Sequence, residues 1–113
     1  MGRYAEKLED IKKLIGRLQK QVPEQIGAFQ NFMGAVEAPD VLDQKEKELV
    51  NVGLAVAAQC EWCIALHVQG ALKAGASKEE IIEAGIQAVL MHGGPALMYM
   101  TPLEEALEEF TNG

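Results

Sequence analysis

The sequence contains few aromatic residues and only two cysteines, Cys60 and Cys63. Aromatic side chains make up 5% of the 113 residues, whereas apolar residues as a whole make up 49%. An interior with so few rings must be assembled mainly from Ala, Val, Leu, Ile and Met. A small domain of this composition often buries part of its apolar surface against another subunit. We therefore expect a homo-oligomer.

Positive charge is also scarce, and no apolar run is long. The chain has ten Lys and Arg residues and 17 Asp and Glu residues, which gives a formal net charge of -7. The basic residues form no stripe. This balance makes nucleic acid a poor candidate partner, and we expect none. The longest weakly polar stretch, residues 49–60, is interrupted by Asn51 and Gln59 and falls short of the roughly 20 residues that span a bilayer. Charges follow Met1 at once, without a secretory pattern. We expect a cytoplasmic protein without a membrane partner.

What the sequence does contain is helical periodicity. No segment alternates polar and apolar residues as a half-buried strand does, and apolar residues recur every three or four positions. We expect one compact all-α domain of about six helices over residues 1–113. Two helices cover residues 4–18 and 23–36, a third follows Asp43 and is buried nearly all round, and a fourth covers residues 64–74. A fifth ends before Gly93 and a last one covers residues 96–110.

Local signals mark several of the helix ends. Asp43 with Glu46 and Ser77 with Glu80 have the spacing of capping boxes. Gly75 suits the left-handed position that ends a helix. Thr101-Pro102 is compatible either with a new helix start or with a bend in a continuous helix.

The Cys-x-x-Cys segment, Cys60-Glu61-Trp62-Cys63, carries the clearest chemical signal. Its cysteines lie one helical turn apart, close enough to form a disulfide when the first precedes a helix. The N–H groups and the dipole at such a helix start stabilise a thiolate, which attacks disulfides and peroxides. In a reducing compartment such a pair is more often catalytic or metal-binding than structural. We interpret it as a redox-active pair.

His67 and Glu48 are the expected partners of the two thiols. His67 follows Cys63 by four residues and Cys60 by seven, so it shares their helix face. An imidazole there can accept a thiol proton, directly or through a water. Glu48 is the candidate to orient the imidazole, because the preceding helix should fold back antiparallel. Twelve helical residues rise about 18 Å and seven rise about 10 Å, so we expect a water to help bridge Glu48 and His67.

Other interpretations stay open on the residues alone. Cys60, Cys63, His67 and His92 are suitable zinc ligands, although a second Cys or His pair at finger spacing is absent. His67 taken singly would be an ordinary hydrogen-bonded histidine. Glu48 taken singly would be a solvated charge.

Taken together, these residues resemble the carboxymuconolactone decarboxylase and alkylhydroperoxidase (AhpD-like) family. The resemblance is strongest over residues 43–94. Its specific part is Glu48, eleven residues, Cys60-Glu61-Trp62-Cys63, three residues, and His67. This composite spacing is far more specific than Cys-x-x-Cys alone. Residues 71–81 are also similar to the family's segment after the histidine.

The resemblance implies an all-helical fold assembled as dimers packed into trimers or hexamers. It also implies a thiol-dependent peroxidase or disulfide reductase. In the family's peroxidases the position of Cys63 is the nucleophile that becomes a sulfenic acid, and the position of Cys60 donates a proton and then resolves the disulfide. Glu48 and His67 match the proton relay. Trp62 stands where those peroxidases have a histidine, which puts peroxidase efficiency in doubt more than disulfide cycling.

We therefore expect a thiol-dependent peroxidase or disulfide oxidoreductase with the catalytic residues Glu48, Cys60, Cys63 and His67. Its partners would be a hydroperoxide or disulfide substrate and a protein or small-molecule dithiol that returns electrons. We expect neither a bound cofactor nor a metal. The alternatives are a redox-sensing or electron-passing protein without peroxidase turnover and, less favoured, the decarboxylase activity, which in the family does not depend on this cysteine pair. The structural zinc module is the least favoured.

Overall fold

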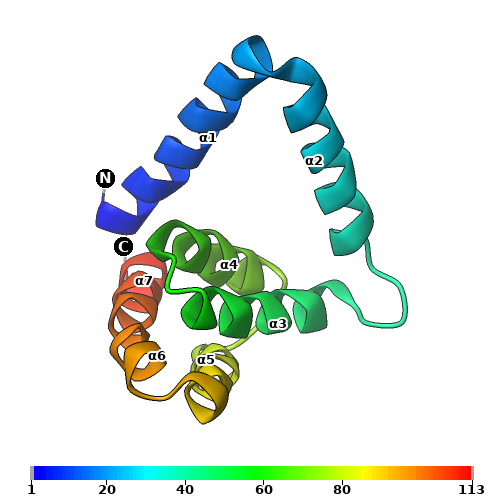
Figure 1. Ribbon diagram of the computed structural model, residues 1–113. Helices are drawn as coiled ribbons and strands as arrows, with labels where there is room; N and C mark the ends of the chain where they lie inside the picture. The colour runs from blue at the N-terminus through cyan, green and yellow to red at the C-terminus, as the bar shows by residue number, and fades with distance from the viewer. Residues whose placement is uncertain (1, 113) are drawn as a thin grey trace.

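The computed structural model describes residues 2–112, and every regular element in that range is a helix (Figure 1). The helices in chain order are α1 (Arg3–Gln21), α2 (Pro23–Glu37), α3 (Gln44–Ala57), α4 (Glu61–Lys73), α5 (Lys78–His92), α6 (Gly94–Met98) and α7 (Met100–Asn112). The all-α class is confirmed, and the count exceeds the expected six by the five-residue α6. None of these helices is long and apolar enough to cross a membrane.

The predicted helix ends are confirmed where local chemistry determines them. Asp43 and Glu46 exchange both hydrogen bonds of a capping box at the start of α3, at 2.9 and 2.8 Å. Ser77 and Glu80 do the same at the start of α5, at 2.8 and 3.1 Å. Gly75 follows α4 with a φ of 95°, which glycine adopts without steric cost. These signals fix the start of α3, the end of α4 and the start of α5.

The C-terminal segment starts a new helix instead of bending an old one. α6 ends at Met98, Tyr99 forms a turn, and α7 begins at Met100. Pro102 therefore lies in the first turn of α7, where the N–H that proline lacks would have no partner inside the helix.

α4 lies at the centre of the core, in contact with α1, α3, α5 and α7. Small side chains on α4 let the neighbouring helices approach closely. Such close packing fills a core that has few large aromatic rings. Two of the bulkiest fully buried residues come from outside the α3–α5 segment, namely Tyr4 of α1 and Leu103 of α7. On α3 and α4, the fully buried residues of the hydrophobic core are Val52, Val56, Ile64, Ala65, Val68 and Ala71.

α1 and α2 form an open V that projects from this bundle (Figure 1). The start of α1 is held by α7, because the carboxylate of Glu109 accepts the N–H groups of Tyr4 and Ala5 at 3.0 and 2.8 Å. α2 packs against α1. Phe29 and Phe32 on α2 are each more than half exposed. The arm helix α2 therefore presents an apolar face that the described part of the chain leaves open.

The expectation that the third helix is buried nearly all round is wrong. Val52 and Val56 of α3 are buried, but Val50 and Leu54 are more than half exposed. The reason is geometric, since Val50 and Leu54 lie along an open cavity of about 430 Å³ between α3 and α5. No other helix within residues 2–112 covers that side.

Candidate functional site

The site begins at the sharp reversal between α3 and α4. Gln59 has a φ of 57°, the left-handed conformation that glycine usually supplies. Its N–H donates to the carbonyl of Val56 at 3.1 Å, and the N–H of Cys60 donates to that of Ala55 at 3.3 Å. This pair of bonds satisfies two of the carbonyls left free at the end of α3. α4 then starts at Glu61, earlier than the apolar pattern predicts, because Cys60 acts as its N-cap.

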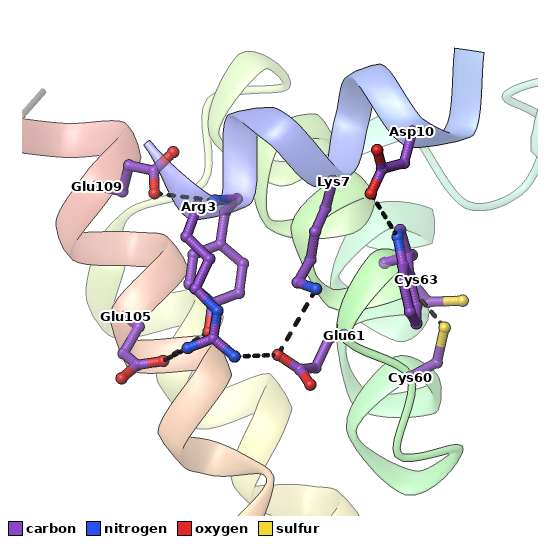
Figure 2. Close-up of polar contacts among 10 residues, drawn as sticks. Arg3, Lys7, Asp10, Cys60, Glu61, Cys63, Glu105 and Glu109 are labelled. Atoms are coloured by element: carbon purple, nitrogen blue, oxygen red, sulfur yellow. Dashed lines mark hydrogen bonds and ion pairs between the residues drawn. The ribbon is translucent and has the colours of Figure 1, made fainter. Parts of the chain in front are cut away.

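The two sulfurs lie at the first turn of α4, as predicted. Both cysteines are free thiols and both are partly exposed. The Sγ of Cys60 accepts the N–H of Cys63 at 3.2 Å, and Figure 2 shows both sulfurs on the same side of the helix start. A sulfur that accepts a backbone N–H at the positive end of a helix is stabilised when it carries negative charge. That favoured position belongs to Cys60.

Cys63 is in the opposite electrostatic situation. Burial, followed by the hydrogen bond and the charge of Cys60, raises the pKa of Cys63 from 9.0 to about 11. Cys63 therefore keeps its proton at neutral pH unless a neighbouring group removes it. The sequence located both cysteines at the helix start but did not distinguish their electrostatic roles.

Glu48 and His67 meet directly. The Nδ1 of His67 on α4 lies 2.8 Å from the Oε1 of Glu48 on α3, and their side chains are only 23% and 13% exposed. Burial by itself raises the pKa of Glu48, but the hydrogen bonds from His67 and Asn51 outweigh it and the net pKa is lowered. The water expected between the two side chains is unnecessary. α3 and α4 pack closely enough for a direct bond.

Gly70 explains why the helices can approach at this point. It lies on α4 three residues after His67, and a Cβ built there would overlap the Oε2 of Glu48 and lie 2.7 Å from its Cδ. The carboxylate of Glu48 thus occupies the space that any other residue at position 70 would fill. Sequence reasoning missed this role, and the only available signal was a glycine inside a helix.

Asn51 was also missed as part of the site. Its Nδ2 donates to the Oε1 of Glu48 at 3.1 Å and to both carboxylate oxygens of Glu37 at 3.0 Å. In the sequence Asn51 is only a polar break in an apolar stretch. Its spacing of three residues from Glu48, on the same helix face, was the signal that could have identified it.

Trp62, between the cysteines, is directed toward α1. Its Nε1 donates to the carboxylate of Asp10 at 3.3 Å, and the Nζ of Lys7 lies 4.4 Å from the ring centroid. Glu61 extends this polar network, pairing with Arg3 at 2.8 Å (Figure 2). α1 is therefore attached to the same helical turn that carries the sulfurs.

The residues considered as zinc ligands do not gather. His92 is the last residue of α5 and lines the cavity between α3 and α5, with Leu49 and Met91. Within residues 2–112 no group of three or more His, Cys, Asp or Glu side chains has an arrangement that could hold a metal ion. The geometry gives the zinc interpretation no support.

Comparisons with known proteins place this geometry in a family. Residues 23–105 match the model of the carboxymuconolactone decarboxylase family. The chain belongs to that family. A carboxymuconolactone decarboxylase family protein of Legionella pneumophila has a solved structure with a TM-score of 0.90 and 38% identity, over 96% of this chain and 97% of that one.

Two further proteins are similar to this chain, and only the first has a suggested function. A family protein of Thermotoga maritima, with a suggested role in an antioxidative response, has a TM-score of 0.85 and 27% identity, over 94% of this chain and 91% of that one. An uncharacterized protein of Cupriavidus necator is 34% identical over 82% of this chain and 82% of its own length.

The region matched by the family model contains the residues of the candidate site, but it does not contain the α1 residues that contact Trp62. Residues 23–105 contain the cysteine pair, Glu48, Asn51 and His67, which come from α3, α4 and the N-cap of α4. Lys7 and Asp10, which contact Trp62, lie before the matched region. In this carboxymuconolactone decarboxylase family chain, the surroundings of Trp62 thus depend on a segment outside the family model.

Proposed function

We propose that this protein is a thiol-dependent oxidoreductase that reduces hydroperoxides with Cys60 and Cys63, using His67 and Glu48 as a proton relay. The observation that carries the proposal is the 2.8 Å contact between His67 and Glu48, on the helix whose first turn presents two free thiols. Membership of the family and the suggested antioxidative role of the Thermotoga maritima protein support it.

In the proposed first step the thiolate of Cys63 attacks the terminal oxygen of the hydroperoxide. An S–O bond forms, the O–O bond breaks, and the leaving alkoxide takes a proton and departs as an alcohol. Cys63 is then a sulfenic acid. The Cys60 thiolate attacks the Cys63 sulfur and releases hydroxide, which becomes water on protonation, and a disulfide forms. An external dithiol, a protein or a small molecule, returns two electrons and two protons.

The raised pKa of Cys63 explains why such a site needs a relay. With a pKa of about 11, only about one Cys63 in ten thousand is a thiolate at pH 7. The Sγ of Cys60, which accepts the N–H of Cys63 at 3.2 Å, lies beside this thiol but raises its pKa, so the proton must leave by another route. His67 lies one turn further along α4, where it can exchange protons with the thiols through a water. Glu48 would keep the Nδ1 of His67 protonated and so leave Nε2 free to act.

Stopped-flow mixing of reduced protein with tert-butyl hydroperoxide tests the proposal. Wild type should form one disulfide per hydroperoxide consumed. Cys63→Ser should abolish the fast reaction, and Cys60→Ser should stop at a sulfenic acid that dimedone traps. His67→Ala should slow the reaction by about 10²-fold or more, whereas His92→Ala, the matched control on α5, should react like wild type. A Cys63→Ser protein that consumes peroxide at the wild-type rate would refute the assignment.

Disulfide exchange without peroxide turnover is a second candidate, favoured by Trp62. The indole offers no proton-transfer group beside the sulfurs, because its only N–H is directed at Asp10. This version predicts rapid reaction of the reduced protein with a disulfide such as 5,5′-dithiobis(2-nitrobenzoate) and background consumption of hydroperoxide. Measuring both rates on one preparation separates the two candidates.

We also propose that a second copy of the chain covers the apolar face of the arm helix α2. That face includes Phe29, Phe32 and Met33. The open cavity between α3 and α5 of the same chain is lined mainly by apolar residues and could receive the α2 face of a second copy. An amphipathic helix from a second copy matches such a groove. Sedimentation analysis should give an oligomer that Phe32→Glu converts toward monomer. A monomeric wild type at micromolar concentration would contradict this.

A further inference from the structure

Asn51 joins two carboxylates that come from different helices. Its Nδ2 donates to the Oε1 of Glu48, one turn earlier on α3, and to both oxygens of Glu37, the last residue of α2. An amide nitrogen has two hydrogens, so one serves Glu48 and the other is shared by the two oxygens of Glu37. Without this amide two negative charges would face each other with no donor between them.

We propose that Asn51 is a positioning residue that holds the Glu48 carboxylate against His67, and that Glu37 ties this position to the arm helix α2. The inference rests on the Glu48–His67 relay of the proposed function and adds two residues to it. Its geometric basis is that one oxygen, the Oε1 of Glu48, receives both the Asn51 N–H at 3.1 Å and the Nδ1 of His67 at 2.8 Å. Two donors from two helices fix that atom.

The link to the arm is reinforced one turn earlier on α3. The Nζ of Lys47 donates to the carbonyl oxygens of Val36 and Ala38, at 2.8 and 2.6 Å. These carbonyls belong to the end of α2, where helical carbonyls lack a partner within the helix. Lys47 and Asn51 therefore fasten the last turn of α2 to the stretch of α3 that carries Glu48. A displacement of the arm helix would be transmitted to the Glu48 carboxylate.

The charges around Glu48 determine the sign of the effect. His67 faces it from α4, Glu37 faces it through Asn51 from α2, and the ammonium of Lys47 is directed at the α2 carbonyls. The Asn51 hydrogen bond is among the contacts that lower the pKa of Glu48. Removing it leaves Glu37 as an uncompensated negative neighbour. Glu48 is then less readily ionised and less well placed, so His67 loses support for its positive form.

The test compares Asn51→Ala and Asn51→Asp with Glu48→Gln as reference and Asn31→Ala, an exposed position on α2, as matched control. Two quantities are measured in each protein: the pH profile of the single-turnover reaction with tert-butyl hydroperoxide, and the titration midpoint of the His67 imidazole by NMR. Asn51→Ala should slow the reaction at pH 7 about tenfold, the effect of one hydrogen bond to a charged group. It should also lower the His67 midpoint, in the same direction as Glu48→Gln.

Asn51→Asp keeps the size of the side chain and substitutes a third carboxylate for the donor. We expect it to slow the reaction more than Asn51→Ala and to shift the pH profile further. Glu37→Ala, which removes the anchor on the arm, should slow the reaction roughly threefold. Asn31→Ala should match wild type in rate, pH profile and His67 midpoint.

The outcomes separate this inference from the proposed function. Wild-type rates and His67 midpoints in both Asn51 variants, together with altered values in Glu48→Gln, would overturn the role of Asn51 and leave the relay intact. An unchanged His67 midpoint and rate in Glu48→Gln would overturn the relay itself and the inference with it. If Asn51→Ala does not fold, the isosteric Asn51→Asp decides, and wild-type behaviour in that variant is sufficient to reject the inference.

Discussion

Replacing Gly70 with alanine perturbs the proposed relay without removing any polar group from it. The new Cβ would overlap the Oε2 of Glu48, so the carboxylate must leave its position beside α4. A hydrogen bond to a charged group contributes about 1.5–3 kcal/mol. Loss of the Glu48–His67 contact is partly offset because alanine is better than glycine inside a helix by about 1 kcal/mol. We expect Gly70→Ala to destabilise the protein by about 1 kcal/mol.

Gly16 provides the matched control for this substitution. It lies within α1 and has no atom within 4 Å of an added Cβ. Gly16→Ala should therefore gain the helical contribution alone and become about 0.5–1 kcal/mol more stable. Urea unfolding measured by circular dichroism at pH 7 compares the two. The free energies of unfolding should differ by about 2 kcal/mol, and the peroxide reaction of Gly70→Ala should be roughly 30-fold slower.

A double-mutant cycle with Glu48→Ala identifies the cause. In the Glu48→Ala background no carboxylate has to move, so Gly70→Ala should change sign and become stabilising. If Gly70→Ala were as stabilising as Gly16→Ala in the wild-type background, and reacted with peroxide at the wild-type rate, the carboxylate would not be held against α4. The reasoning that connects Gly70 to the relay would then be wrong.

Three further predictions follow from local geometry. The folded pKa of Glu48 lies below its ordinary 4.5. Its contribution to stability is therefore present above pH 4.5 and is lost as the pH falls through the folded pKa. Urea unfolding should show that the free energy of unfolding falls less steeply in acid for Glu48→Gln than for Glu24→Gln. Cys60→Ser removes a neighbour that raises the pKa of Cys63. Alkylation of Cys63 at pH 8, measured by mass spectrometry, should therefore accelerate roughly threefold or more. An unchanged rate would contradict the effect of Cys60 on the pKa of Cys63. Gln59→Gly relieves a left-handed residue and should raise the free energy of unfolding by about 0.5–1 kcal/mol, whereas a fall would show that Gln59 is not strained.

Most of the fold could be predicted because its signals are local. The capping boxes at Asp43 and Ser77, and the left-handed Gly75, depend on a few consecutive residues. Helix burial could not be predicted in the same way, since an all-apolar stretch does not say which side faces a neighbour. Val50 and Leu54 look like core residues in the sequence, yet they line an open groove.

The candidate site was predictable where one helix determines the geometry. Cys60 caps α4, and Cys63 and His67 lie four residues apart on it, so their spacing was sufficient to place them relative to the helix. Contacts between helices were harder, because they depend on interaxial distance. The direct Glu48–His67 bond requires the absence of a side chain at Gly70, and the Glu37–Asn51 contact requires the position of the arm. Neither distance can be read from residue types.

Trp62 bears most directly on which chemistry the proposed relay can support. A hydroperoxide releases an alkoxide, which is far more basic than the thiolate with a pKa near 8.5 that a disulfide releases. Peroxide reduction therefore demands proton delivery at the moment of bond cleavage, whereas disulfide exchange demands much less. The indole N–H of Trp62 donates to Asp10 and its ring lies against Lys7, so Trp62 contributes no proton. In the proposed mechanism, proton delivery therefore depends on Glu48 and His67. Any weakening of that pair should reduce peroxide reduction more than disulfide exchange, so the ratio of the two rates measures the relay.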